Sequence, residues 1–164
     1  MEQVTDYFGA ERLESLFFIG VGVVALGIAA YALLASQNAV LRGAAWPLAL
    51  VAFIQLGVGG GVYVRSPKHI TRVQHLVTAE PKRVRSEEIP RMEVVMKNFV
   101  LYRWIEIGLL VAAILLCALA PAVSAWRGVG IGLLVQAGLM LALDLFAEHR
   151  GGVYLGWLRS LTFD

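Results

Sequence analysis

Four long apolar stretches, most of them separated by short polar segments, dominate the hydrophobic pattern of the chain. They cover residues 16–35, 44–64, 99–120 and 129–147. Each has the roughly 20 residues that a helix needs to cross a ~30 Å hydrocarbon core. The short turns after the first and third stretches make neighbouring helices antiparallel. The pattern predicts an all-α integral membrane protein: a four-transmembrane-helix antiparallel bundle, with 1–164 as a single membrane domain.

Residues 65–98, between the second and third spans, form the one sizeable polar segment. Ser66 suits a helix N-cap and Pro67 the first helical position. The apolar positions that follow share one helical face: Ile70, Val73, Leu76 and Val77. This pattern predicts a short amphipathic cytoplasmic helix between spans two and three, lying on the membrane surface with its basic residues near anionic headgroups.

Composition supports a membrane protein over a soluble one. The chain is 59% hydrophobic and 16% charged, whereas soluble domains are nearer half apolar and a quarter charged. No basic face alternates with aromatic residues, so nucleic-acid binding is not expected. The single Cys117 excludes an intrachain disulfide.

The distribution of Lys and Arg predicts the orientation of the spans. Eleven of these residues lie at the N-terminus, in the 65–98 loop or at the C-terminus, whereas the two short turns on the opposite side hold only Arg42 and Arg127. Positive residues favour the cytoplasmic side. We therefore expect a multi-pass protein of the cytoplasmic (inner) membrane with both termini cytoplasmic. The acidic N-terminus does not resemble a cleaved signal peptide, so the first span is expected to remain.

Charged residues recur at one depth of the predicted bundle. Counted from the outer helix ends at 1.5 Å per residue, Glu106 and Asp144 both lie ~21–22 Å deep. Arg103, three residues before Glu106, can reach it on the same helix. The candidate polar cluster near the cytoplasmic face comprises Glu14, Arg65, Arg103, Glu106, Asp144 and Glu148. Such residues normally face the bundle interior and mark function.

Three interpretations of this cluster remain open. It can be structural, with Arg103 and Arg65 neutralising the carboxylates. It can be an ion, proton or metal site, although Glu148 and His149 are adjacent and do not form the Glu-x-x-His pair usual in bundle metal sites. It can recognise a lipid headgroup or a polar small molecule through Arg103 and Arg65. No metal is assigned, and any cofactor is unknown.

Glycines and aromatic residues suggest how the helices pack and end. Gly57 and Gly61 form a small-xxx-small pair that favours tight packing within the subunit, with a homo-oligomer as the alternative. Gly151-Gly152 predicts a helix stop. The segment after it, 153–163, is rich in aromatic residues and predicts an interfacial anchor. Its aromatic residues are Tyr154, Trp157 and Phe163.

No recognisable catalytic motif accompanies these features, so catalytic residues are unknown and enzyme activity is undecided. The leading hypothesis is a small polytopic membrane interaction protein of accessory, regulatory or immunity type. Its partners are the lipid bilayer and, at the 65–98 loop, a protein or an anionic lipid. The alternative is a membrane-embedded enzyme or carrier that acts on a polar headgroup, small ligand or ion through Arg103, Glu106 and Asp144.

Overall fold

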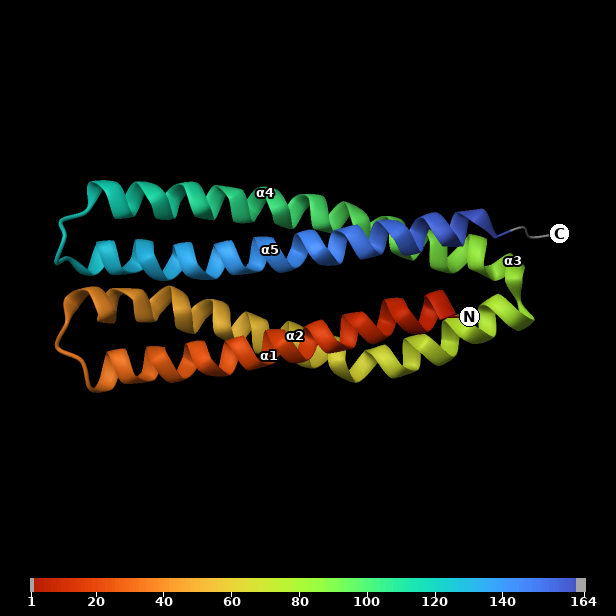
Figure 1. The fold of residues 1–164 in the computed structure, drawn as a ribbon, viewed down its shortest axis with the longest axis horizontal. Coiled ribbons are helices and arrows are strands. Elements are labelled where there is room, and N and C mark those ends of the chain that lie inside the picture. The colour runs from red at the N-terminus through yellow and green to blue at the C-terminus, as the bar shows by residue number, and fades with distance from the viewer. Residues whose placement is uncertain (1, 162–164) are drawn as a thin grey trace.

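The computed structural model describes residues 2–161, which form an antiparallel four-helix bundle (Figure 1). The long helices are α1 (Glu2–Leu34), α2 (Ala39–Ala79), α4 (Ile89–Leu119) and α5 (Ala125–Ser160), and the short α3 (Pro81–Arg83) and a π-helical turn η1 (Val84–Glu88) lead into α4. Four candidate membrane spans lie in α1, in α2, in the run from α3 to α4, and in α5. The predicted bundle of four apolar helices is confirmed.

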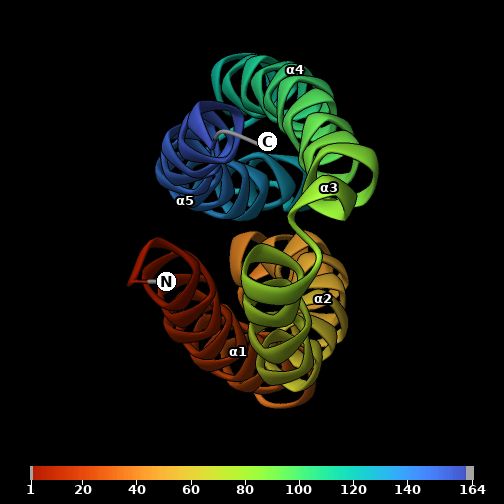
Figure 2. The ribbon, with the colours of Figure 1, turned by 90° about the vertical axis from the view of Figure 1, so that its right-hand side faces the viewer.

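The bundle consists of two helical hairpins that pack side by side. α1 packs on α2, α5 packs on α4, and the contact of α2 with α5 joins the hairpins (Figure 2). Side chains cap the first turn after each hairpin connection. Oδ1 of Asn38 accepts a hydrogen bond from the Val40 N–H at 2.9 Å, and Oγ of Ser124 accepts one from the Arg127 N–H at 3.2 Å. These caps satisfy N–H groups that have no partner within the helix.

At the end of the bundle where α1 begins and α5 ends (Figure 1), the long helices continue past the apolar stretches of the sequence. With 41 residues, α2 is about 60 Å long, twice the thickness of a hydrocarbon core. We define the head as residues 2–14, 66–98 and 150–161. Its apolar core is built from buried residues of α1, α2, η1, α4 and α5, namely Val4, Phe8, Val73, Leu76, Val84, Met92, Tyr154, Leu155 and Leu158.

The predicted amphipathic helix on the membrane surface is wrong, because its residues are the last turns of α2. Ser66 does not cap a helix; its hydroxyl donates to the carbonyl of Val62 at 2.7 Å, one turn earlier in the same helix. Val73 and Leu76 are buried in the head core rather than in lipid. The apolar face was recognised correctly, but its partners are the other helices of the head.

The predicted helix stop at Gly151-Gly152 is also wrong, since α5 continues to Ser160. A Cβ at Gly151 would lie 2.9 Å from Sδ of Met96, so this glycine allows α5 to approach α4. The anchor interpretation fails for Tyr154, which is buried in the head core, and Trp157 is partly buried and packs against the same core. Phe163 lies outside the described residues.

The close contacts between helices involve glycines other than the predicted pair, Gly57 and Gly61. A Cβ at Gly57 or Gly61 would meet no atom of residues 2–161 within 4 Å, so neither glycine serves packing within the described bundle. Instead, a Cβ at Gly128 would lie 1.9 Å from the carbonyl oxygen of Val40, and one at Gly132 would lie 2.6 Å from that of Ala44. The backbones of α5 and α2 therefore touch at the end of the bundle opposite the head.

Candidate functional site

Charged side chains of all four long helices lie where the apolar spans meet the head, and we call them the charged belt. The belt comprises Glu11, Glu14, Arg65, Arg103, Glu106, Asp144, Glu148 and Arg150. Between α1 and α2, Nη2 of Arg65 lies 3.4 Å from Oε1 of Glu11, and the Ser66 hydroxyl, whose hydrogen is directed mainly at Val62, lies 3.3 Å from the other oxygen of this carboxylate. These contacts add to the packing of α1 on α2 in the first hairpin.

A second ion pair of the belt joins the two hairpins. Nη2 of Arg150 on α5 donates to Oε2 of Glu14 on α1. Both side chains are largely buried, at 31% and 18% exposed. A partly buried ion pair is screened less by solvent than a surface pair, so this contact helps to fix α1 against α5.

The third ion pair links α4 to α5. Nη1 of Arg103 donates to both carboxylate oxygens of Glu148, at 3.1 and 3.0 Å. This partner differs from the expected one, because Arg103 was predicted to reach Glu106 on its own helix. The Arg103 side chain turns toward the head instead, which brings its charge to the polar end of the span.

Glu106 meets a second carboxyl group rather than a cation. Its side chain, which is 4% exposed, lies near the carboxyl group of Asp144 on α5 and interacts with it electrostatically. Two neighbouring carboxyl groups repel each other when both are ionised. Oε2 of Glu106 is buried and finds no N–H or hydroxyl donor in the described part of the chain. The span therefore contains two neighbouring carboxyl groups, of which Glu106 has a buried oxygen without a donor among the described residues.

The six candidate residues thus lie in one belt but form separate pairs rather than a single cluster. Arg103 contacts Glu148 and Glu106 contacts Asp144, while Glu14 and Arg65 each bind a residue outside the predicted set. Glu11 and Arg150 complete those pairs. The sequence places both at the right level, but spacing along one helix does not show which residue of another helix lies opposite.

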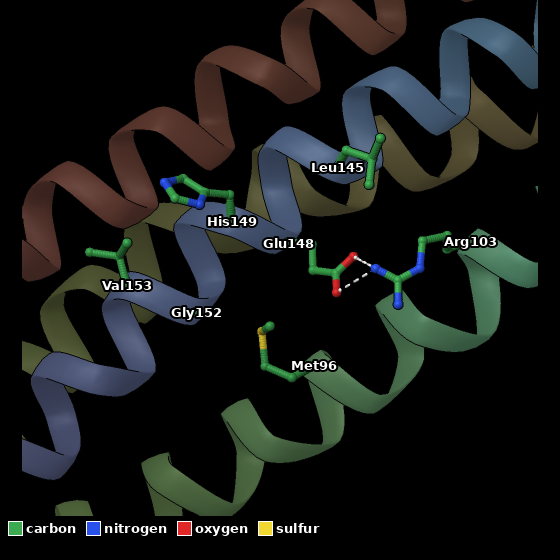
Figure 3. A pocket seen from close by; sticks show the side chains of 7 residues that line it. All are labelled: Met96, Arg103, Leu145, Glu148, His149, Gly152 and Val153. Atoms are coloured by element: carbon green, nitrogen blue, oxygen red, sulfur yellow. Dashed lines mark hydrogen bonds and ion pairs between the residues drawn. The ribbon is translucent and has the colours of Figure 1, made fainter.

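An open groove of about 510 Å³ runs between α4 and α5 beside this belt (Figure 3). Arg103 and Glu148 face each other across it, and His149 points away from them. The rest of its lining is mainly apolar: Met96, Leu145, Gly152 and Val153. The groove therefore places one cation and one anion between apolar walls at the edge of the span.

The head also contains a buried polar cluster that no motif in the sequence indicates. Glu88, the last residue of the π-helical turn, is fully buried and accepts hydrogen bonds from Arg91 at 2.9 and 2.6 Å. The Tyr154 hydroxyl donates to the same carboxylate at 3.3 Å. Burial raises the pKa of Tyr154, and the nearby Glu88 acts in the same direction. Pro81 and Pro90 flank this turn in the sequence, but spacing along the chain does not show that the Glu88 side chain points into the head core.

Aromatic rings enclose this cluster. The rings of Tyr7 and Tyr154 stack with centroids 4.3 Å apart, and the Arg91 guanidinium carbon lies 5.8 Å from the ring centroid of Phe8. Burial raises the pKa of Tyr7 to about 12, with Glu11 acting in the same direction. The His69 ring also packs against Phe8, with centroids 5.8 Å apart, and its pKa is lowered by burial and then by the neighbouring Arg91 and Arg65.

The described residues contain no group of three His, Cys, Asp or Glu side chains that could hold a metal ion. No family model, curated protein or solved structure matches the chain. The classification therefore rests on fold and composition, which indicate a small multi-pass membrane protein with four candidate spans.

Proposed function

We propose that the chain is a small polytopic membrane interaction protein of accessory, regulatory or immunity type, and that its head is the part that meets a partner protein. The observation that supports this proposal is the head itself. All four long helices continue into it, and together they enclose a separate apolar core. A rigid projection of this kind offers a preformed surface, which lowers the entropy cost of binding.

The charge of the head suggests the chemistry of the partner. At its tip, Lys82 and Arg85 make no ion pair with any described residue, whereas the neighbouring Arg83 binds Glu80 and Glu87. Free cations at an exposed tip favour an acidic partner surface. From the bias of Lys and Arg we also propose that the head and both termini lie in the cytoplasm and that the membrane is the cytoplasmic (inner) one.

Site-specific photo-crosslinking in intact cells tests this function. We expect a probe at Lys82 or Arg85 to give one discrete adduct with another protein, and the charge reversals Lys82→Glu and Arg85→Glu to weaken it. A probe at Leu115, a half-exposed residue of the α4 span, is the matched control. Recovery of only the protein itself, by crosslinking and by pull-down from mild detergent, would contradict the proposal.

The Glu106–Asp144 pair favours a second candidate, a membrane-embedded carrier or enzyme that handles a proton, an ion or a polar ligand near Arg103. Carboxyl groups inside a span are costly, and they commonly mark proton or ion pathways. Glu106→Gln and Asp144→Asn keep the size of each side chain but remove its titratable group. If both variants fold normally and leave the biological phenotype unchanged, this candidate fails. The partner adduct formed at Lys82 should survive both substitutions.

A further inference from the structure

The groove between α4 and α5 faces outward at the level where a span ends, which is the level of lipid headgroups. Arg103 and Glu148 lie in the middle of it (Figure 3). Leu145 continues the groove toward the spans and Val153 toward the head, and both are about half exposed. A molecule in this groove would contact apolar side chains and the ion pair at the same time.

The Arg103 guanidinium has hydrogen-bonding capacity to spare. It donates to Glu148 from Nη1 alone, and its Nη2 and Nε atoms make no hydrogen bond to any described residue. Because a guanidinium carries five N–H donors, Arg103 can bind a phosphate without releasing Glu148. With its side chain 35% exposed, it is accessible from the groove.

Glu148 complements this donor with an acceptor. Its carboxylate has about four lone-pair positions, and Arg103 takes two of them. The positions left over suit a second cation that can donate hydrogen bonds. The groove therefore presents a phosphate partner and an ammonium partner side by side.

We propose that this groove binds the headgroup of a phospholipid with a primary amine, of the phosphatidylethanolamine type. Arg103 binds the phosphate, Glu148 binds the ammonium group, and an acyl chain lies along Leu145. A choline headgroup has no N–H to donate to Glu148, and a glycerol headgroup brings no cation. This proposal does not depend on the proposed role of the head in partner binding.

Lipid retention by the full-length protein tests the proposal. The protein is reconstituted in nanodiscs with equal amounts of dioleoyl phosphatidylethanolamine, phosphatidylcholine and phosphatidylglycerol, re-extracted in mild detergent, and examined by native mass spectrometry. We expect the wild type to retain phosphatidylethanolamine about tenfold over phosphatidylcholine, as charge-assisted hydrogen bonds would allow. Arg103→Gln should remove most of this retention, whereas Arg127→Gln, at the opposite end of the bundle, should leave it intact.

Glu148→Gln provides the sharper readout. This variant keeps Arg103, which binds the phosphate, but removes the carboxylate that binds the ammonium group. The ratio of retained phosphatidylethanolamine to retained phosphatidylcholine should therefore fall toward one. If Arg103→Gln fails to fold, Leu145→Trp keeps both members of the ion pair, places a bulky ring in the apolar part of the groove, and should also abolish retention. Equal retention of the three lipids by the wild type, preference for phosphatidylglycerol, or retention that survives Leu145→Trp would each overturn the proposal.

Discussion

Gln55 and Gln136 join the two hairpins inside the apolar part of the bundle. Nε2 of Gln55 on α2 donates to Oε1 of Gln136 on α5 at 3.3 Å, and both side chains are almost fully buried. The other two polar atoms of the pair, Oε1 of Gln55 and Nε2 of Gln136, find no partner among the described residues. Because lipid offers no hydrogen bonds, each amide depends on the other.

The first prediction concerns this amide pair. Gln55→Leu or Gln136→Leu leaves one buried amide alone, and we expect each to lower the free energy of unfolding by about 1–2 kcal/mol. The double variant should lose less than the two single variants together, with a coupling of roughly 1 kcal/mol, as found for hydrogen bonds between membrane helices. Unfolding in detergent, followed by circular dichroism, measures all four proteins. Additive losses would show that the two side chains do not interact.

The second prediction separates the glycines that allow close packing from those that do not. In Gly128→Ala the new Cβ would lie 1.9 Å from the backbone carbonyl of Val40, so the two hairpins must move apart. We expect a loss of about 1–3 kcal/mol in the free energy of unfolding, as for other overpacked sites.

Gly57→Ala is the matched control for Gly128→Ala, because nothing lies within 4 Å of its new Cβ. It should be neutral or stabilise α2 by up to about 1 kcal/mol, since alanine is the better helix former. The same unfolding measurement serves both variants. Equal effects of the two substitutions would contradict the observed contact of α2 with α5.

The third prediction tests whether the head has a core of its own. Leu76→Ala removes a side chain that is 3% exposed, and the cavity should cost about 2–5 kcal/mol. Val94→Ala changes a side chain of the head that is 56% exposed and should cost little. Native-state hydrogen exchange of the head amides measures both. Equal protection in the two variants would instead favour a helix on the membrane surface.

The fourth prediction concerns pH. His69 lies against Phe8, and burial, with Arg91 and Arg65 nearby, lowers its pKa below the usual value of 6.5. As the pH falls through about 6.5, the unfolded chain binds a proton before the folded one does, so protonation favours unfolding. The stability contributed by neutral His69 is therefore complete above this pH and declines below it.

Thermal unfolding at pH 7.5 and pH 5.5 measures the effect of His69. We expect the melting temperature of the wild type to fall on acidification, and the melting temperature of His69→Gln to fall by less. His75→Gln, which changes a side chain that is 65% exposed, is the control and should behave as the wild type. A wild type and a His69→Gln variant with the same dependence on pH would show that His69 makes no contribution.

The sequence by itself determined the four apolar helices and the level at which charges gather, because both follow from position along one chain. Twenty apolar residues make a candidate span whatever surrounds them, and a rise of 1.5 Å per residue sets the depth of Glu106 and Asp144. The apolar helical face that contains Val73 and Leu76 could likewise be recognised from the sequence of the 65–98 segment.

Only the tertiary structure decided what each of these faces meets. The face of Val73 lies in a protein core rather than in lipid, and Arg103 binds Glu148 on α5 rather than Glu106 on its own helix. The physical reason is that lipid and a neighbouring helix both accept apolar side chains, so hydrophobicity does not distinguish them. Likewise, the partner of a charge is set by the rotation and register of another helix, and these depend on side-chain packing between helices distant in the chain.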